Sequence, residues 1–172
     1  AGLTFIESTQ RGKLNLQSSA PVLISEQAVW PGINIEDAEA MPSGAPWIDT
    51  NAGFFRFAKA ASKAAIWISN TPPVGKVIPV SRYIQAISDA RFVGGHWVIA
   101  LDRDFSGRLL QREEKALEEW KQINAVLSFY QTHQSWNAYA PAGEMAVIQS
   151  VQGGGLLSGG VLDMISSKHT PI

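Results

Sequence analysis

Short apolar segments alternate along this chain with longer amphipathic ones, and this alternation limits the fold more than any other feature. Short apolar runs predict strands at 3–6, 21–25, 46–48, 65–69, 97–101 and 145–148. Apolar residues spaced three and four apart predict helices over 54–61, from 81 to the glycine pair 94–95, over 112–133 and over 156–168. Strands that alternate with helices in this way are typical of parallel sheets with right-handed crossover connections.

Two architectures fit this order, an open doubly wound sheet and part of a (β/α)₈ barrel. A complete barrel takes about 250 residues, and this chain has 172. We therefore expect an α/β fold in which parallel strands and crossover helices form a partial (β/α)₈ (TIM) barrel.

Individual residues refine the predicted helices. Ser81 is a candidate N-cap, and Gly94 and Gly95 would end the helix that it starts. The segment Asp102-Arg103-Asp104 offers two carboxylates, but the intervening Arg and the lack of a third ligand favour a solvated loop over a metal site. The buried stripe of the long helix is predicted to consist of Leu117, Trp120, Ile123, Leu127 and Tyr130.

Composition excludes several functional classes. The chain has no cysteine, so disulfides and thiolate catalysis are excluded. Its formal net charge is −1, with no block of Lys or Arg, which argues against nucleic acid as the main partner. No apolar run reaches the roughly 18–20 residues of a membrane helix. The three His residues include no pair at the helical spacing of four, so we expect no metal site. We expect no cofactor either.

A polar residue follows each predicted strand. These strand-end residues are Glu7, Glu26, Asp49, Asn70, Asp102 and Gln149. Ligands of parallel α/β folds collect at the carboxyl ends of the strands, so the whole set would face one ligand-binding edge. The alternative is turn chemistry, because Asp and Asn also favour strand exits and cap the following helix.

Carboxylates that converge on one edge can act on a glycosidic bond or hold sugar hydroxyl groups. The six Trp residues favour a carbohydrate, because an indole face packs against a pyranose, although a Trp within a strand more often belongs to the core. The candidate catalytic residues are Asp49, Asp102 and Glu26. The candidate substrate-binding residues are Trp47, Asn51, Trp67, Asn70, Trp97 and Gln149.

A run of three glycines suggests a different ligand, an anion such as phosphate. Gly153, Gly154 and Gly155 lie between a predicted strand and a predicted helix, as in a phosphate-binding turn. The full GxGxxG pattern is absent because position 158 is Ser. A small-molecule α/β domain that binds an anion at this turn is therefore one further interpretation.

Segments 46–54 and 90–98, together with the stretch from Glu119 through Met145-Ala146-Val147-Ile148, resemble bacterial (β/α)₈ glycoside-hydrolase-like proteins. The latter stretch is similar to the junction in β-galactosidase-like enzymes where the barrel meets a glutamine-amidotransferase-like domain. The resemblance implies that residues 1–140 form the second half of a barrel and that 141–172 begin a flavodoxin-like or amidotransferase-like unit. The strand matched to the one that carries the family's nucleophile ends in Ser69-Asn70, without a carboxylate, so no catalytic role is transferred.

The leading hypothesis is a carbohydrate-active, glycoside-hydrolase-like module that binds or cleaves a sugar through strand-end carboxylates. The alternative is a non-catalytic structural or sugar-binding (β/α) module, or a fragment of a larger protein. A half-barrel leaves sheet edges unpaired, so we also expect self-association or completion by another part of a longer chain. Carbohydrate is the expected ligand, with no nucleic acid and no membrane as partner.

Overall fold

In the computed structural model, residues 7–10, 13–15, 17–26, 51–69, 71–139, 142–143, 145–148, 161–162 and 165 are described. Within them, four strands form one sheet in the order β1-β2-β3-β4, and every neighbouring pair is parallel. The strands are β1 (Glu7–Gln10), β2 (Val22–Glu26), β3 (Ile66–Ser69) and β4 (His96–Val98). The predicted α/β class with parallel strands is thereby confirmed.

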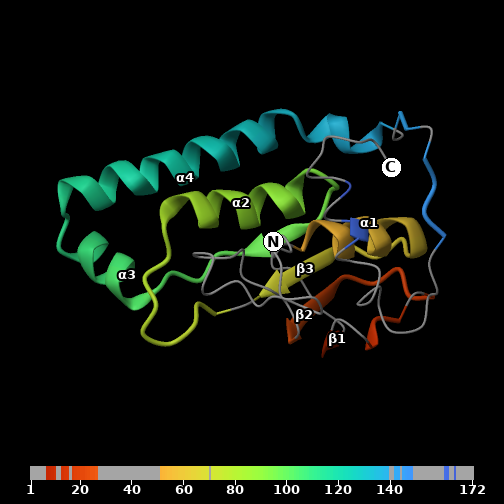
Figure 1. The fold of residues 1–172 in the computed structure, drawn as a ribbon, viewed down its shortest axis with the longest axis horizontal. Helices are drawn as coiled ribbons and strands as arrows, with labels where there is room; N and C mark the ends of the chain where they lie inside the picture. The colour runs from red at the N-terminus through yellow and green to blue at the C-terminus, as the bar shows by residue number, and fades with distance from the viewer. Residues whose placement is uncertain are drawn as a thin grey trace.

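The helices lie in layers on one side of the sheet (Figure 1). Helix α1 (Ala52–Ala61) precedes β3, and α2 (Val80–Arg91) connects β3 to β4. After β4 come α3 (Arg103–Leu110), α4 (Glu114–Thr132) and the 3₁₀ helix η2 (Gln134–Ala138). Helix α2 packs against both β4 and α4, so the order of layers is sheet, α2 and α4 (Figure 1).

The core lies between the sheet and α1 and α2. Alternate strand residues point into it, and the parallel register aligns Ile24 with Ile68 and Ile68 with Trp97. These three side chains are buried, as the strand period of two residues requires. The helices contribute the buried residues Phe54, Phe55, Ala58, Tyr83, Ala86, Ile87 and Ala90.

A glycine pair after α2 makes a close approach possible. Gly94 has a φ of +83°, which glycine adopts without strain. A Cβ atom on Gly95 would collide with the ring of Phe55 on α1. The predicted end of the helix at this pair is confirmed, since α2 ends at Arg91.

Three local predictions are wrong. Helix α2 begins after Pro79 rather than at a Ser81 cap, because Pro79 takes an extended conformation and Ser81 lies inside the first turn. Segment 102–104 is not a solvated loop, since Asp102 caps α3 and the next two residues begin it. Residues 145–148 form no strand and their side chains are exposed.

The buried stripe of α4 also differs from its prediction. Leu117 is 46% exposed, whereas the adjacent Ala116 is fully buried, because α4 meets α2 along a face that includes Ala116 and Ile123. Trp120 and Leu127 are partly buried against the core, as expected. The long helix itself and the strands at 22–26 and 66–69 confirm their predictions within one or two residues at each end.

Several predicted elements lie outside the described residues, among them the strands at 3–6 and 46–48. Of the last predicted helix, Val161, Leu162 and Ile165 have helical backbone. The four parallel strands are a partial α/β arrangement and not a complete barrel, and the domain boundary at 140 stays a prediction. No helix in the described part of the chain is long and apolar enough to cross a membrane.

Candidate functional site

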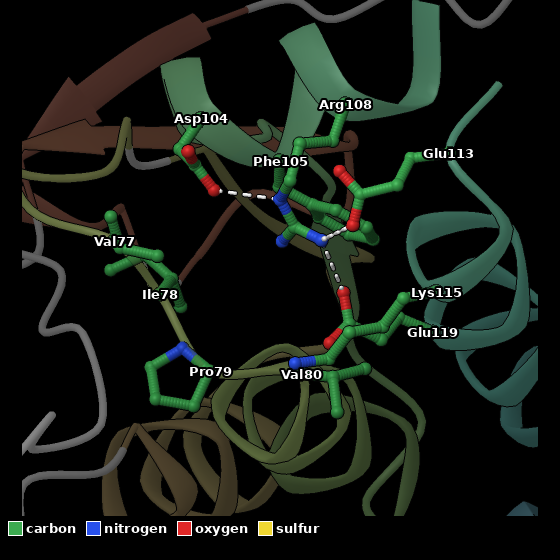
Figure 2. Close-up of a pocket in the computed structure, with 10 residues that line it drawn as sticks. All are labelled: Val77, Ile78, Pro79, Val80, Asp104, Phe105, Arg108, Glu113, Lys115 and Glu119. Atoms are coloured by element: carbon green, nitrogen blue, oxygen red, sulfur yellow. Dashed lines mark hydrogen bonds and ion pairs between the residues drawn. The ribbon is translucent and has the colours of Figure 1, made fainter. Parts of the chain in front are cut away.

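A pocket of about 350 Å³ opens beyond the carboxyl ends of β3 and β4. This is the edge where parallel α/β folds bind ligands, because the loops that leave the strands meet there. One wall comes from the segment that leads into α2, and the other from α3 and the start of α4 (Figure 2). The pocket is lined by Val77, Ile78, Pro79, Val80, Asp104, Phe105, Arg108, Glu113, Lys115 and Glu119.

Asp102 connects these two walls through hydrogen bonds. Its Oδ1 accepts a hydrogen bond from the Phe105 backbone N–H at 2.9 Å, which caps α3. Its Oδ2 accepts from the Ile78 backbone N–H at 3.2 Å and from the Tyr83 hydroxyl at 2.8 Å. The residue is only 3% exposed, so its carboxylate is occupied by the protein itself.

Tyr83 completes the hydrogen-bond network of Asp102. Its hydroxyl donates to the Asp102 carboxylate and accepts from the Asp102 backbone N–H at 2.7 Å. Burial raises the pKa of Tyr83 well above its usual value, so the hydroxyl keeps its proton. For Asp102 the turn-chemistry alternative is therefore confirmed: the side chain caps a helix. Its catalytic assignment stays a prediction, now with a structural role beside it.

Arg108 is the centre of the polar wall. Its Nε donates to Asp104 Oδ2 at 2.8 Å, one helical turn earlier on α3. Its Nη1 lies 3.1 Å from Glu119 Oε2 on α4 and 3.5 Å from Glu113 Oε1 in the turn between the helices. Its guanidinium carbon also lies 5.4 Å from the centre of the Phe105 ring. These contacts fix the guanidinium group in one orientation.

The charge of Arg108 is permanent. Hydrogen bonds to Asp104 and Glu119 raise the pKa of Arg108 above its already high value. The remaining terminal nitrogen of Arg108, Nη2, faces the open cavity (Figure 2). In the same view the ammonium group of Lys115 points toward Val80. The pocket thus presents fixed hydrogen-bond donors and acceptors opposite an apolar wall of Val77, Ile78 and Pro79.

The structure describes only some of the predicted site residues. Trp47, Asp49, Asn70 and Gln149 lie outside the described residues. The backbone of Glu26 ends β2 at the carboxyl edge, as predicted. Glu7, in contrast, begins β1 and so lies at the opposite edge of the sheet.

Three other candidates lie away from the pocket. Asn51 is buried just before α1, where its backbone carbonyl accepts from the Phe55 N–H. Trp97 is buried in the core. Among the described residues, Asn51, Trp67, Trp97 and Asp102 are not among those that line this pocket.

Trp67 stacks on the His96 ring, with centroids 4.1 Å apart. Arg91 Nη1 lies 2.8 Å from His96 Nδ1, so that nitrogen is an acceptor and the proton resides on Nε2. Burial, and secondly the charge of Arg91, lower the pKa of His96. Burial and the contact with Arg91 therefore favour the neutral form of His96 in the folded protein.

The residues that sequence analysis missed are Arg108, Glu113 and Glu119. A signal was present, because Asp104 and Arg108 are four apart, the spacing of a helical ion pair. The link to α4 depends on the turn between the helices, where Arg112 adopts a φ of +56°. That turn gave no pattern from which the contact could be predicted.

No protein-family model matches the sequence, and neither a curated protein nor a solved structure was found to match it. The function must therefore be argued from the site itself.

Proposed function

We propose that this chain is a carbohydrate-binding (β/α) module whose sugar occupies the pocket beyond the carboxyl ends of β3 and β4. The observation that carries the proposal is the composition of the two walls. One wall offers Arg108, Lys115 and three carboxylates, and the other offers aliphatic side chains and a proline. A pyranose has the same division, with hydroxyl groups around its rim and C–H groups on its faces.

The size and rigidity of the pocket support a small ligand. Its volume of about 350 Å³ lies near the lower end of the roughly 300–1,000 Å³ that small-molecule sites occupy. The polar wall is preorganised, since Arg108 is 23% exposed and contacts three carboxylates that come from two helices and the turn between them. A fixed donor loses little entropy when it binds, which favours affinity for a weakly held neutral ligand.

Binding is a better interpretation than hydrolysis for this pocket. A glycosidase needs one carboxyl group to donate a proton and a second to act as a base or nucleophile. The carboxylates that line the pocket all lie against Arg108, and the nearby carboxylate of Asp102, which bonds Ile78 and Phe105 of the lining, is occupied by three donors. A hydrolytic role for Asp49 and Glu26 remains the second candidate, since the carboxyl edge is where Glu26 ends β2.

A partial (β/α)₈ barrel is the finer fold that we propose. The strands follow each other in the sheet in chain order, without the reversal that defines a doubly wound fold. The helices that connect them lie on one side of the sheet, as the outer ring of a barrel does (Figure 1).

A filled pocket tests the proposal. Val77 lines the pocket, whereas Val74 lies in the same loop, is fully exposed and is not among the lining residues. We expect Val77→Trp to abolish the stabilisation that a bound methyl glycoside gives, and Val74→Trp to leave it unchanged. The measurement is the shift of the melting temperature over a glycoside concentration series, because a ligand of the folded state alone raises it.

Two results would contradict the proposal. One is a wild-type protein whose melting temperature no glycoside raises. The other is equal stabilisation of wild type and Val77→Trp, which would move the sugar to another part of the chain. Turnover of an aryl glycoside, abolished by Asp49→Asn with the melting temperature retained, would favour the hydrolytic candidate instead.

A further inference from the structure

We infer that the pocket selects an uncharged sugar through a pair of neighbouring hydroxyl groups, and that it rejects the corresponding uronic acid. One hydroxyl oxygen accepts from Arg108 Nη2, and the adjacent hydroxyl donates to a carboxylate beside that guanidinium. This inference rests on the proposed function and specifies the chemistry of its ligand.

The donor half of the contact is set by how Arg108 is used. A guanidinium group has five N–H donors in one plane. Nε is directed to Asp104 and Nη1 to Glu119 and Glu113. Nη2 faces the cavity (Figure 2), so a ligand that enters must place an acceptor oxygen in front of it or leave a charged donor without a partner.

The acceptor half comes from the same carboxylates. Each of them contacts Arg108 through one oxygen, Oδ2 of Asp104, Oε1 of Glu113 and Oε2 of Glu119. A carboxylate oxygen has two lone pairs and each group has a second oxygen, so capacity to accept remains. A donor and an acceptor side by side match two adjacent hydroxyl groups, one of which accepts while the other donates.

The charge of the pocket decides against an acidic sugar. Three carboxylates and two cationic side chains line it, which leaves an excess of one negative charge. Arg108 is already neutralised by its contacts, and Lys115, the other cation of the lining, does not offset the charge of all three carboxylates. A uronate would therefore meet net repulsion, whereas a neutral hexose would not.

Matched ligands provide the test. The probes are the methyl glycosides of galactose, glucose and mannose, each beside its uronic acid, which differs only in the carboxylate at C6. For the pair that binds, we expect the neutral glycoside to bind about tenfold more tightly at low salt, with the difference shrinking as salt screens the charges. Isothermal titration calorimetry on the full chain gives both dissociation constants.

A pair of variants separates charge from shape. Glu119 contacts Arg108 in the pocket, whereas its neighbour Glu118 is exposed and pairs with Lys121. Glu119→Gln keeps an oxygen for Arg108 and removes one negative charge, so we expect it to narrow the difference between glycoside and uronate. Glu118→Gln should leave the difference unchanged.

Each outcome has one meaning. A uronate that binds as tightly as its neutral partner overturns this inference and leaves the proposed sugar site standing. A preference for the neutral glycoside that Glu119→Gln does not alter also overturns it. Failure of every glycoside and every uronate to bind contradicts the proposed function, and this inference with it.

Discussion

Two acidic side chains separated by one residue have opposite surroundings, although both lie at the start of α3. Asp102 is 3% exposed, and three donors of the protein occupy its carboxylate. Asp104 has a 49% exposed side chain and shares Arg108 with Glu119 and Glu113 at the wall of a pocket. The first cluster is closed and the second is open, since Arg108 still turns one nitrogen toward the cavity (Figure 2).

This contrast shows how a carboxylate near the end of a strand can be assigned. Both residues follow β4 by a few positions, so position alone does not distinguish a structural group from a ligand-binding one. The number of internal donors does distinguish them, because each internal hydrogen bond removes capacity for a ligand. Three variants and one change of pH test the difference between the two clusters.

The largest effect is expected at Asp102. Asp102→Ala leaves the buried Ile78 N–H, Phe105 N–H and Tyr83 hydroxyl without their acceptor, so we expect a loss of about 3–5 kcal/mol in the free energy of unfolding. Asp104→Ala is the matched control, with an expected loss below about 1 kcal/mol because its ion pair is exposed. Equal losses in urea denaturation would remove the distinction between the two clusters.

Tyr83→Phe tests the same closed cluster more mildly. The change removes the hydroxyl and leaves the Asp102 N–H without its acceptor, while the ring still packs against Phe105. We expect a loss of about 2 kcal/mol in the free energy of unfolding, measured by denaturation with urea. Sugar binding should persist, because Tyr83 does not line the pocket. A variant as stable as wild type would show that the network contributes little.

Arg108→Met should have a small effect on stability and a large effect on sugar affinity, the reverse of the changes in the Asp102 cluster. Its ion pairs are partly exposed, so we expect a loss of only about 1 kcal/mol in stability. Glycoside affinity should fall at least tenfold by calorimetry, because the donor that faces the cavity is gone. Arg103→Met, at the exposed first residue of the same helix, is the control. Undiminished affinity in Arg108→Met would mean that the open cluster is not the site.

The smallest expected effect is the change of stability with pH. It also sets the pH range in which the three variants are compared. The pKa of His96 is lower in the folded protein than in the unfolded chain, because burial and Arg91 disfavour its charged form. The folded state binds fewer protons there, so stability is fully present above the unfolded pKa of about 6.5 and falls as the pH drops toward the folded pKa. Urea denaturation between pH 7.5 and 5 should show this decline, and His96→Asn should flatten it. A decline of the same size in that variant would assign it to other groups.

Sequence patterns were most informative where apolar residues form a continuous run or recur along a long helix. Strands β2 and β3 could be predicted from short apolar runs, and helix α4 from the spacing of its apolar residues. Helix α3 could not, since it has eight residues and one fully buried side chain, Phe105. Its signs were the Asp102 cap and the spacing of Asp104 and Arg108. The sequence left three interpretations of Asp102 open: a catalytic carboxylate, a helix cap and part of a solvated loop.

The candidate site was harder to predict than the fold. The expected edge of the sheet does carry a pocket, but the groups that line it come from helices rather than from strand ends. Strand-end reasoning finds residues such as Glu26 and Asp102, whereas Arg108 depends on how α3 meets α4. That meeting is a tertiary contact across a turn, and no local spacing encodes it.

The proposed site requires that Arg108 bind a sugar hydroxyl. The most direct measurement follows the side-chain Nε–Hε resonances of the arginines by NMR while the neutral methyl glycosides are added. We expect a saturable shift of the Arg108 resonance, assigned by its loss in Arg108→Met, while the Arg103 resonance stays in place. Saturable binding that leaves Arg108 unmoved, or no binding by any glycoside, would contradict it.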